Sequence, residues 1–378
     1  MKNRHSNSNP IDRRTLIKAG AALGLAAVAA PAIVRAAGSS SGELNFMGWS
    51  GIKLDPLFEA FTNKTGIKIK FIGQPDEDSM FAQCRLALET GGIDCVEPSA
   101  ARVPVWVSNG VAQPWDETKL ALDSLEDAFA ANKQAKVDGK RYFVPSTWGT
   151  EALTFSTAKA DSKYGTASLA DIFDPKNEGL VAVRAHSALA ALGRVMDLDG
   201  KLPHPFIDSY TNEAAMRANW DIILAEAIKH KSNVVQFWNG ETDAEAAFRT
   251  NGCALGLTWD TTGFKLKSEG LPFGFIAPKE GAFGWLQGYV LMKNATNVEQ
   301  AHAFANFVAS AEGSAKNATA FSSNPVGKGG IDLMDQEVVA FYRSAYPGDA
   351  LSKIWWWPAQ DTWFVKLRSE YADKFQAA

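Results

Sequence analysis

The stretch from Glu43 to Phe71, ELNFMGWSGIKLDPLFEAFTNKTGIKIKF, predicts a strand, a helix and a second strand. Its first apolar residues indicate a short strand that ends near Trp49, and the apolar residues at 57, 58 and 61 recur at helical spacing. Gly66 ends the helix, because glycine tolerates the left-handed conformation of a helix C-cap. Residues 67–71 alternate between apolar residues and lysines, which is the period of a strand. The stretch is therefore one βαβ unit of a parallel sheet.

The loop after the first strand is a predicted ligand contact. It runs from Gly48 to Gly51 and holds Trp49 and Ser50. In open α/β sheets ligands bind outside the carboxyl ends of the strands. We therefore expect both side chains to face a ligand.

Strands and helices alternate along the rest of the chain, which predicts an α/β fold with largely parallel sheets. A chain of this length is expected to form two lobes rather than one core. Residues 141–145 and 152–155 indicate two successive strands around Trp148, which we interpret as a crossing between lobes. Helices are expected at 76–88, 188–196, 214–228 and 362–375, and further strands at 93–96, 180–183, 234–238, 253–258 and 273–277.

Aromatic or polar residues recur after the predicted strands. Two lobes that face one another would gather these residues in one cleft between them. Ser99 also suits the N-cap of the helix that follows it. The residues in question are Trp49, Ser99, Trp148, Arg184, Trp259 and Trp285.

Residues 1–36 predict an export signal rather than part of the fold. Arg13-Arg14 precede an apolar run of about 16 residues that is rich in Ala and Gly, which is short for a membrane span of roughly 20 residues. The small residues near Ala36 suit cleavage before Ala37. This pattern is typical of a twin-arginine signal, and a membrane anchor is the alternative interpretation. We expect the twin-arginine export machinery to deliver the chain to the periplasm.

The composition argues against a nucleic-acid-binding protein. The whole chain has a formal charge of −4, and residues 1–36 hold six of its basic residues and one acidic residue. The remainder is thus strongly acidic, whereas nucleic-acid binding requires a basic patch. Three cysteines allow at most one disulfide, and their spacing resembles no metal site. We expect buried thiols, with a Cys84–Cys95 bridge as the alternative.

Several short motifs, in this order, resemble the periplasmic spermidine/putrescine-binding proteins of ABC importers. The resemblance covers essentially the whole chain after the signal. It implies two α/β lobes joined by crossing strands, which close on a ligand and deliver it to an inner-membrane permease, without a cofactor or a metal and as a monomer. The motifs are LNFMGWSG at 44–51, EPS at 97–99, VPSTWGT at 144–150, LGLTWD at 255–260 and APKEGAFGWLQGYVL at 277–291.

The resemblance also implies lobe boundaries and binding residues. One lobe would comprise residues 37–145 and about 287–330, and the other about 146–286 and 331–378. Trp49 and Ser99 match cleft-lining residues of the family, while Trp259 and Trp285 match the two tryptophans that stack on the ligand. Aromatic faces attract the methylenes and the charged ends of an amine, with roughly 0.5–2 kcal/mol per cation–π contact.

The sequence departs from this family where the family places carboxylates. Arg184 follows the strand that ends at Val183, and Gln287 stands two residues after the second tryptophan. A buried ammonium without a carboxylate is costly, so Asp260, Glu97 or Glu151 would have to supply one. Arg184 suits an anionic group, which it can bind bidentately, although an interlobe salt bridge is the alternative role. The pattern favours a zwitterionic or quaternary amine over a simple polyamine.

Three other functions are alternatives to an amine-binding protein. A binding protein for a purely anionic ligand would need Arg184 in the cleft. An enzyme is disfavoured, because the five histidines are scattered and no nucleophile elbow, zinc helix or phosphate loop is present. A ferric-iron-binding relative would use tyrosines, and Tyr342 and Tyr346 lie one helical turn apart, although core packing explains this spacing as well.

Overall fold

The computed structural model describes residues 42–159 and 162–378. Strand β1 (Gly42–Trp49), helix α2 (Asp55–Thr65) and strand β2 (Ile67–Gln74) form the predicted unit, and the two strands pair in parallel from Gly42↔Ile67 to Trp49↔Gln74. Gly66 adopts the left-handed conformation with φ 77°, and its N–H donates to the carbonyl of Thr62. The prediction for the opening stretch is confirmed.

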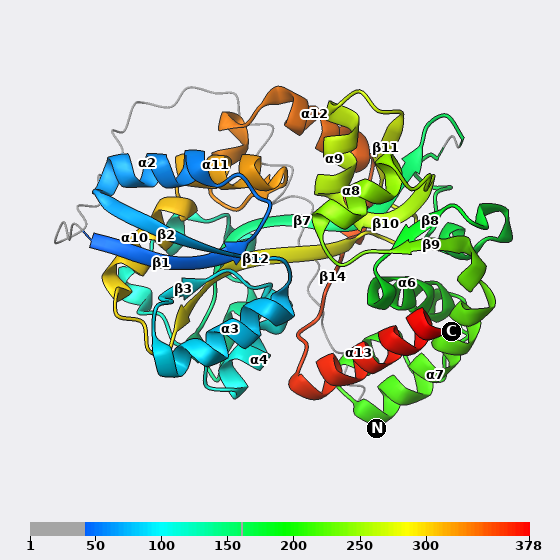
Figure 1. Ribbon diagram of the computed structural model, residues 1–378, viewed down its shortest axis with the longest axis horizontal. Coiled ribbons are helices and arrows are strands. Elements are labelled where there is room, and N and C mark those ends of the chain that lie inside the picture. Colours follow the sequence, from blue (N-terminus) through cyan, green and yellow to red (C-terminus); the bar gives the residue numbers. More distant parts are fainter. Residues whose placement is uncertain (1–41, 160–161) are drawn as a thin grey trace.

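One continuous sheet runs through the molecule in the order β2-β1-β3-β12-β7-β10-β8-β9. Figure 1 shows two groups of helices and strands, one around β1 and β2 and the other around β8 and β9, with β7 and β12 extending between them. This two-lobed α/β architecture agrees with the predicted fold class. The remaining strands of this order are β3 (Cys95–Val96), β7 (Val144–Ser156), β8 (Val181–Val183), β9 (Val234–Phe237), β10 (Leu255–Trp259) and β12 (Phe283–Met292).

The two strands predicted around Trp148 form one continuous strand, β7, which crosses between the lobes beside β12. β7 continues unbroken through Trp148 and pairs antiparallel with β12 on one side and with β10 on the other. Trp148 is buried in a core cluster that also holds Met47, Trp106 and Phe129, and it does not line the cavity described below. The expectation that it faces a ligand is therefore wrong.

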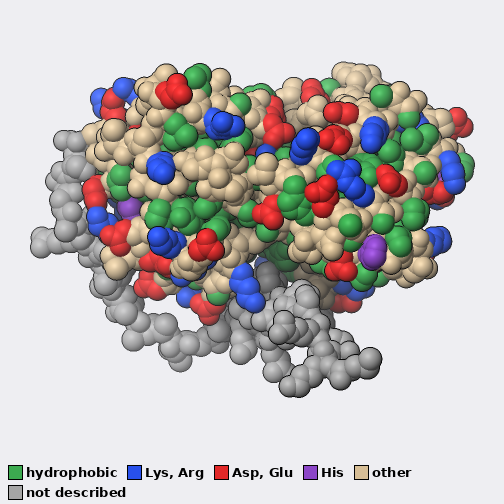
Figure 2. All heavy atoms as spheres, turned by 90° about the horizontal axis from the view of Figure 1, so that it is seen from below, with side chains coloured by type: hydrophobic (Ala, Val, Ile, Leu, Met, Phe, Trp, Pro, Cys, Tyr) green, Lys and Arg blue, Asp and Glu red, His purple; other side chains and the backbone are tan. Residues whose placement is uncertain are grey.

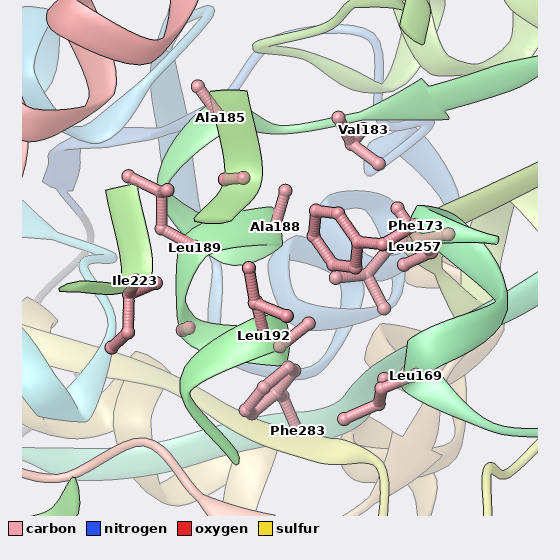
Figure 3. Packing of buried hydrophobic residues seen from close by; sticks show 14 of the residues in the cluster. Leu169, Phe173, Val183, Ala185, Ala188, Leu189, Leu192, Ile223, Leu257 and Phe283 are labelled. Carbon is pink, nitrogen blue, oxygen red and sulfur yellow. The ribbon is translucent and has the colours of Figure 1, made fainter. Parts of the chain in front are cut away.

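Helices cover both faces of the sheet, as burial of parallel strands requires. The largest core lies under α6, where an apolar face that includes Leu189 and Leu192 packs against Phe173, Leu257 and Phe283 (Figure 3). The helices are α3 (Glu77–Thr90), α4 (Val103–Ser108), α5 (Asp127–Ala130), α6 (Ala185–Leu198), α7 (Glu213–Lys229), α8 (Glu241–Arg249), α9 (Asp260–Ser268), α10 (Val298–Ala309), α11 (Ala311–Phe321), α12 (Gln336–Ala345) and α13 (Thr362–Ala377).

Short strands attach to this frame at its edges and around the crossing. β4 (Ala112–Gln113) and β14 (Trp355–Trp356) pair with β12, and β11 (Phe273–Ile276) and β13 (Asn324–Pro325) pair with β7. β14 returns the chain to the crossing from α12 before it enters α13. Strands β5 (Lys136–Val137) and β6 (Lys140–Arg141) form a separate hairpin.

Acidic and basic side chains are interspersed over the described part of the face in Figure 2. None of the helices within 42–159 and 162–378 is long and apolar enough to cross a membrane. The twin-arginine signal at 1–36 lies outside the described residues, and the residue boundaries of the two lobes remain a prediction.

Candidate ligand-binding cleft

A cavity of about 560 Å³ lies at the carboxyl ends of β1, β3, β8 and β10 and along β12. Seven of the predicted site residues line it: Trp49, Ser50, Ser99, Arg184, Trp259, Trp285 and Gln287. We call the side formed by the loops after β1, β2 and β3 the N-terminal wall. We call the side formed by the first turns of α6, α8 and α9 together with α13 the C-terminal wall.

Tryptophans from both walls meet in the cavity. The rings of Trp49 and Trp259 lie edge to face with centroids 6.4 Å apart, and Trp259 in turn contacts buried Trp238 at 4.9 Å. The indole N–H of Trp49 donates to the carbonyl of Glu97 at 3.0 Å, which fixes the ring at the end of β1. Trp356 and Trp357 also line the cavity.

Trp285 lies against the bare backbone of Gly149 on the neighbouring strand. A Cβ at position 149 would stand 2.3 Å from the Trp285 ring and 2.5 Å from a carboxylate oxygen of Asp260. Only glycine fits so close an approach. The absence of a side chain at Gly149 thus lets the indole approach the crossing strand closely.

Four polar atoms of cavity-lining residues are buried without a hydrogen-bond partner among the described residues. They are the Nε donors of Arg102 and Arg368, the indole Nε1 of Trp285, which is also a donor, and the amide Oε1 of Gln287, an acceptor. An unpaired buried polar group costs about 1–3 kcal/mol, so a ligand that pairs with any of these atoms recovers free energy. Donors and an acceptor in one cavity suit a polar ligand with both kinds of group.

Glu77 supplies a carboxylate to the N-terminal wall that the sequence analysis missed. It accepts hydrogen bonds from the backbone N–H of Ser99 at 2.9 Å and from the Ser99 hydroxyl. Ser99 therefore binds Glu77 rather than capping the following helix as predicted. Burial raises the pKa of Glu77, while Arg102 and Ser99 oppose that rise.

Arg184 lines the cavity but is already paired. Its Nη2 donates to the fully buried carboxylate of Glu151 at 2.7 Å, and its guanidinium stacks over Trp238 and Trp259 at 5.3 and 5.1 Å. The hydroxyl of Ser187 donates to the same oxygen of Glu151. Of the two roles considered for Arg184, the structure gives it a salt bridge to Glu151 at the edge of the cavity.

Asp260, like Trp148, does not line the cavity although it was predicted to face the ligand. It is fully buried, and its carboxylate accepts from the backbone N–H groups of Thr150 and Thr261 at 2.8 and 3.1 Å. Burial raises its pKa well above the ordinary value for aspartate. Asp260 thus ties α9 to β7 behind the tryptophans.

The tyrosines considered for iron are core residues. Tyr342 and Tyr346 are buried and stack with their planes 4° apart. The hydroxyl of Tyr342 donates to the carbonyl of Ser322, and that of Tyr346 bonds to the hydroxyl of Thr150. Neither lines the cavity. Within the described ranges, no group of three or more His, Cys, Asp and Glu side chains is arranged to hold a metal ion.

Seven charged residues of the cavity were not predicted as contacts: Asp76, Glu77, Asp78, Arg102, Glu241, Arg368 and Asp373. Glu77 and Glu241 begin α3 and α8 shortly after strands β2 and β9 end, so the rule that located Trp49 would have found them. Glu241 accepts from the hydroxyls of Thr261 at 2.5 Å and Thr262 at 3.0 Å. The three cysteines are free and buried, so the Cys84–Cys95 bridge is not formed.

Comparison with known proteins assigns the family. The pattern of the bacterial extracellular solute-binding proteins matches residues 56–334. The spermidine/putrescine-binding periplasmic protein of Salmonella typhimurium is 29% identical over 298 residues, which cover 78% of each chain. Its relative SpuD of Pseudomonas aeruginosa, a putrescine-binding periplasmic protein, is 23% identical over 330 residues, 82% of this chain and 85% of the relative.

Among solved structures, a putative spermidine/putrescine ABC transporter protein from Listeria monocytogenes superposes with a TM-score of 0.71 at 21% identity. The match covers 89% of this chain and 99% of that one. The cavity, the crossing strands and the family pattern agree with one another. The chain therefore belongs to the bacterial extracellular solute-binding proteins and is a binding protein rather than an enzyme.

Proposed function

We propose that this protein is the periplasmic component of an ABC importer and binds a small amine-containing solute for delivery to an inner-membrane permease. A zwitterionic or quaternary amine is the favoured ligand, and a simple polyamine is the alternative. The protein acts as a monomer after export by the twin-arginine route. The names of its relatives, which bind spermidine or putrescine, support the class of transporter and the amine.

The observation that carries the proposal is the cavity's combination of tryptophan faces with carboxylates. Trp49, Trp259 and Trp285 line the same space as Glu77 and Glu241. An ammonium group gains cation–π attraction from the rings and charge neutralisation from a carboxylate, while the methylenes of the ligand are shielded from water. Glu77 and Glu241 supply these carboxylates from α3 and α8, whereas the carboxylates that the family resemblance leads one to expect after Val183 and at position 287 are absent from the sequence.

The first test is a thermal-shift screen of the purified protein. A tight ligand raises the melting temperature by mass action. The panel contains putrescine, spermidine, betaines, amino acids, aminophosphonates and taurine. A shift with at least one amine is expected. The absence of a shift with every amine of the panel contradicts the proposal.

Substitution of the stacking tryptophans then tests the assignment of the cleft. Trp259→Ala and Trp285→Ala should each weaken binding of the ligand from the screen by about 1–3 kcal/mol, because each removes stacking and apolar contact. Isothermal titration calorimetry measures the loss. Trp363→Ala is the matched control, since Trp363 is a half-buried tryptophan of α13 that does not line the cavity. Unchanged affinity in either cavity variant would remove that residue from the site.

A further inference from the structure

Arg368 is the one arginine of the cavity without a carboxylate partner among the residues that the structure describes. It projects from α13, and its Nη1 donates to the side-chain carbonyl of Gln360 at 2.9 Å. Its Nε is buried and has no hydrogen-bond partner. Within 42–159 and 162–378, no carboxylate oxygen lies within 4.0 Å of its guanidinium nitrogens.

The other two cavity arginines are neutralised. Arg102 contacts Asp78 at 2.7 Å, and Arg184 contacts Glu151 at 2.7 Å. In each pair, both residues belong to the same lobe. The carboxylate neutralises the arginine, which therefore has little net charge to offer a ligand. Arg368 is therefore the guanidinium that gains most from an incoming anion, because a cation taken out of water needs a counter-charge.

The surroundings of Arg368 reinforce its positive field. Helix α13 packs on α6, whose first turn lines the cavity and has no side-chain cap, so its free N–H groups are open to an acceptor. His186 in that turn stays neutral, since burial and the nearby Arg184, Arg368 and Arg102 hold its pKa well below the ordinary value. Burial and the proximity of Arg102 also lower the pKa of Arg368, to about 10.

We propose that Arg368 receives an acidic group of the ligand, so that the bound solute is an amine that also carries a carboxylate or a similar anion. This inference rests on the proposed function and extends it. The tryptophans and Glu241 hold the ammonium end, while the guanidinium fork of Arg368 holds the anionic end bidentately. Arg184 takes the structural role, because Glu151 already occupies its fork.

Asp78 is the competing partner for Arg368. It stands on α3 across the cavity, and its electrostatic influence on Arg368 opposes that of Arg102. Its Oδ1 is engaged by Arg102, however, and its side chain is 64% exposed. If closure of the lobes brought Asp78 onto Arg368, the arginine would serve as a latch between lobes and would not discriminate between ligands.

The experiment compares ligands of equal length that differ in one end group. Isothermal titration calorimetry is run with α,ω-diamines, ω-amino carboxylates, ω-amino sulfonates and dicarboxylates against the wild-type protein, Arg368→Gln, Arg368→Lys and Arg217→Gln. Arg217 is the matched control, an exposed arginine of α7 paired with Glu213. Circular dichroism of each unliganded variant checks that it is folded.

The wild-type protein is expected to prefer the amino carboxylate or amino sulfonate to the diamine. Arg368→Gln should weaken that ligand at least about tenfold and leave the diamine as tight or tighter. Arg368→Lys should retain part of the affinity, because it keeps the charge and loses the fork. Comparison of the ω-amino carboxylate with the ω-amino sulfonate identifies the acidic group that the site prefers.

Each of the other possible results contradicts either this inference or the proposed function. If wild type binds diamines only, or if Arg368→Gln weakens diamines and amino acids equally, as a latch would, the inference is wrong and the proposed function stands. If only dicarboxylates bind and Arg368→Gln abolishes this, the anion site is correct and the amine proposal is wrong. An absence of binding throughout the panel contradicts both.

Discussion

On the N-terminal wall of the cavity, each charged side chain meets a partner from the same wall. Asp76 caps α3, Glu77 is held by Ser99, and Asp78 is paired with Arg102. On the C-terminal wall, Arg184 is neutralised from behind by Glu151, whereas Arg368 has only the amide of Gln360.

This difference between the two walls shows how proteins of one architecture can come to bind different ligands. Both walls are built from loops and helix starts at the carboxyl ends of strands, where small changes in side chains leave the sheet intact. The N-terminal wall keeps a carboxylate that is fixed by its neighbours. The C-terminal wall has one cation committed to the fold and one available to a ligand.

The largest expected effect comes from breaking the salt bridge between Glu151 and Arg184. Glu151→Gln leaves Arg184 without its counter-charge in a partly buried position, and we expect the free energy of unfolding to fall by about 3 kcal/mol. Urea denaturation measures the loss. Arg184→Met in the same background should restore much of it, because the uncompensated charge is then removed.

The matched control for this experiment is Glu213→Gln, in an exposed pair with Arg217 on α7. It should leave stability nearly unchanged, since exposed ion pairs contribute little. A stability loss in Glu151→Gln no larger than in this control would contradict the view that Arg184 is structurally committed. It would make both arginines available to a ligand.

The next prediction concerns Glu97, which directly follows β3. Its side chain is fully buried, its carboxyl group accepts one hydrogen bond, from the hydroxyl of Ser146, and burial raises its pKa to about 8. The native state thus binds a proton that the unfolded state has already released above pH 4.5. Stability must therefore fall as the pH rises from about 4.5 towards 8.

Glu97→Gln should remove this fall. At pH 9 the variant should exceed wild type by on the order of 2 kcal/mol in unfolding free energy, with little difference at pH 4. Urea denaturation across this pH range provides the measurement, and Glu89→Gln, an exposed glutamate of α3, serves as the control. Parallel pH profiles for wild type and Glu97→Gln would show that Glu97 is ionised in the fold.

The residues of the cleft that the sequence predicted share a local signal. Trp49 and Trp259 are the last residues of β1 and β10, and Ser99 and Arg184 come shortly after β3 and β8. Their place at the carboxyl end depends only on where each strand stops. Trp148 failed the same rule because it lies inside a continuous strand. Successive side chains of a strand face opposite sides, so Gly149 meets Trp285 while Trp148 enters the core.

The residues that escaped prediction depend on tertiary packing. Arg368 lies in the middle of α13, and its exposure to the cavity depends on how that helix packs on α6, which no short pattern encodes. The pairing of Arg184 with Glu151 joins residues 33 positions apart. The sequence thus indicated which elements reach the cavity, but it did not indicate which charges remain uncompensated there.

The smallest expected effect tests the fixed carboxylate of the N-terminal wall. Ser99→Ala removes the hydroxyl that donates to Glu77 and retains the backbone N–H bond. The loss of one hydrogen bond to a charged group should weaken amine binding by about 1 kcal/mol.

The Ser99→Ala substitution should also move the pKa of Glu77 further upward, because the Ser99 hydroxyl opposes the effect of burial. Calorimetric titration from pH 5 to pH 8 should therefore show a larger loss of affinity at the acid end than in wild type. Ser108→Ala, which removes an exposed hydroxyl of α4 away from the cavity, should bind as wild type does. If Ser99→Ala binds amines as wild type does at every pH, Glu77 does not contact the ligand, and the amine would be recognised by the C-terminal wall alone.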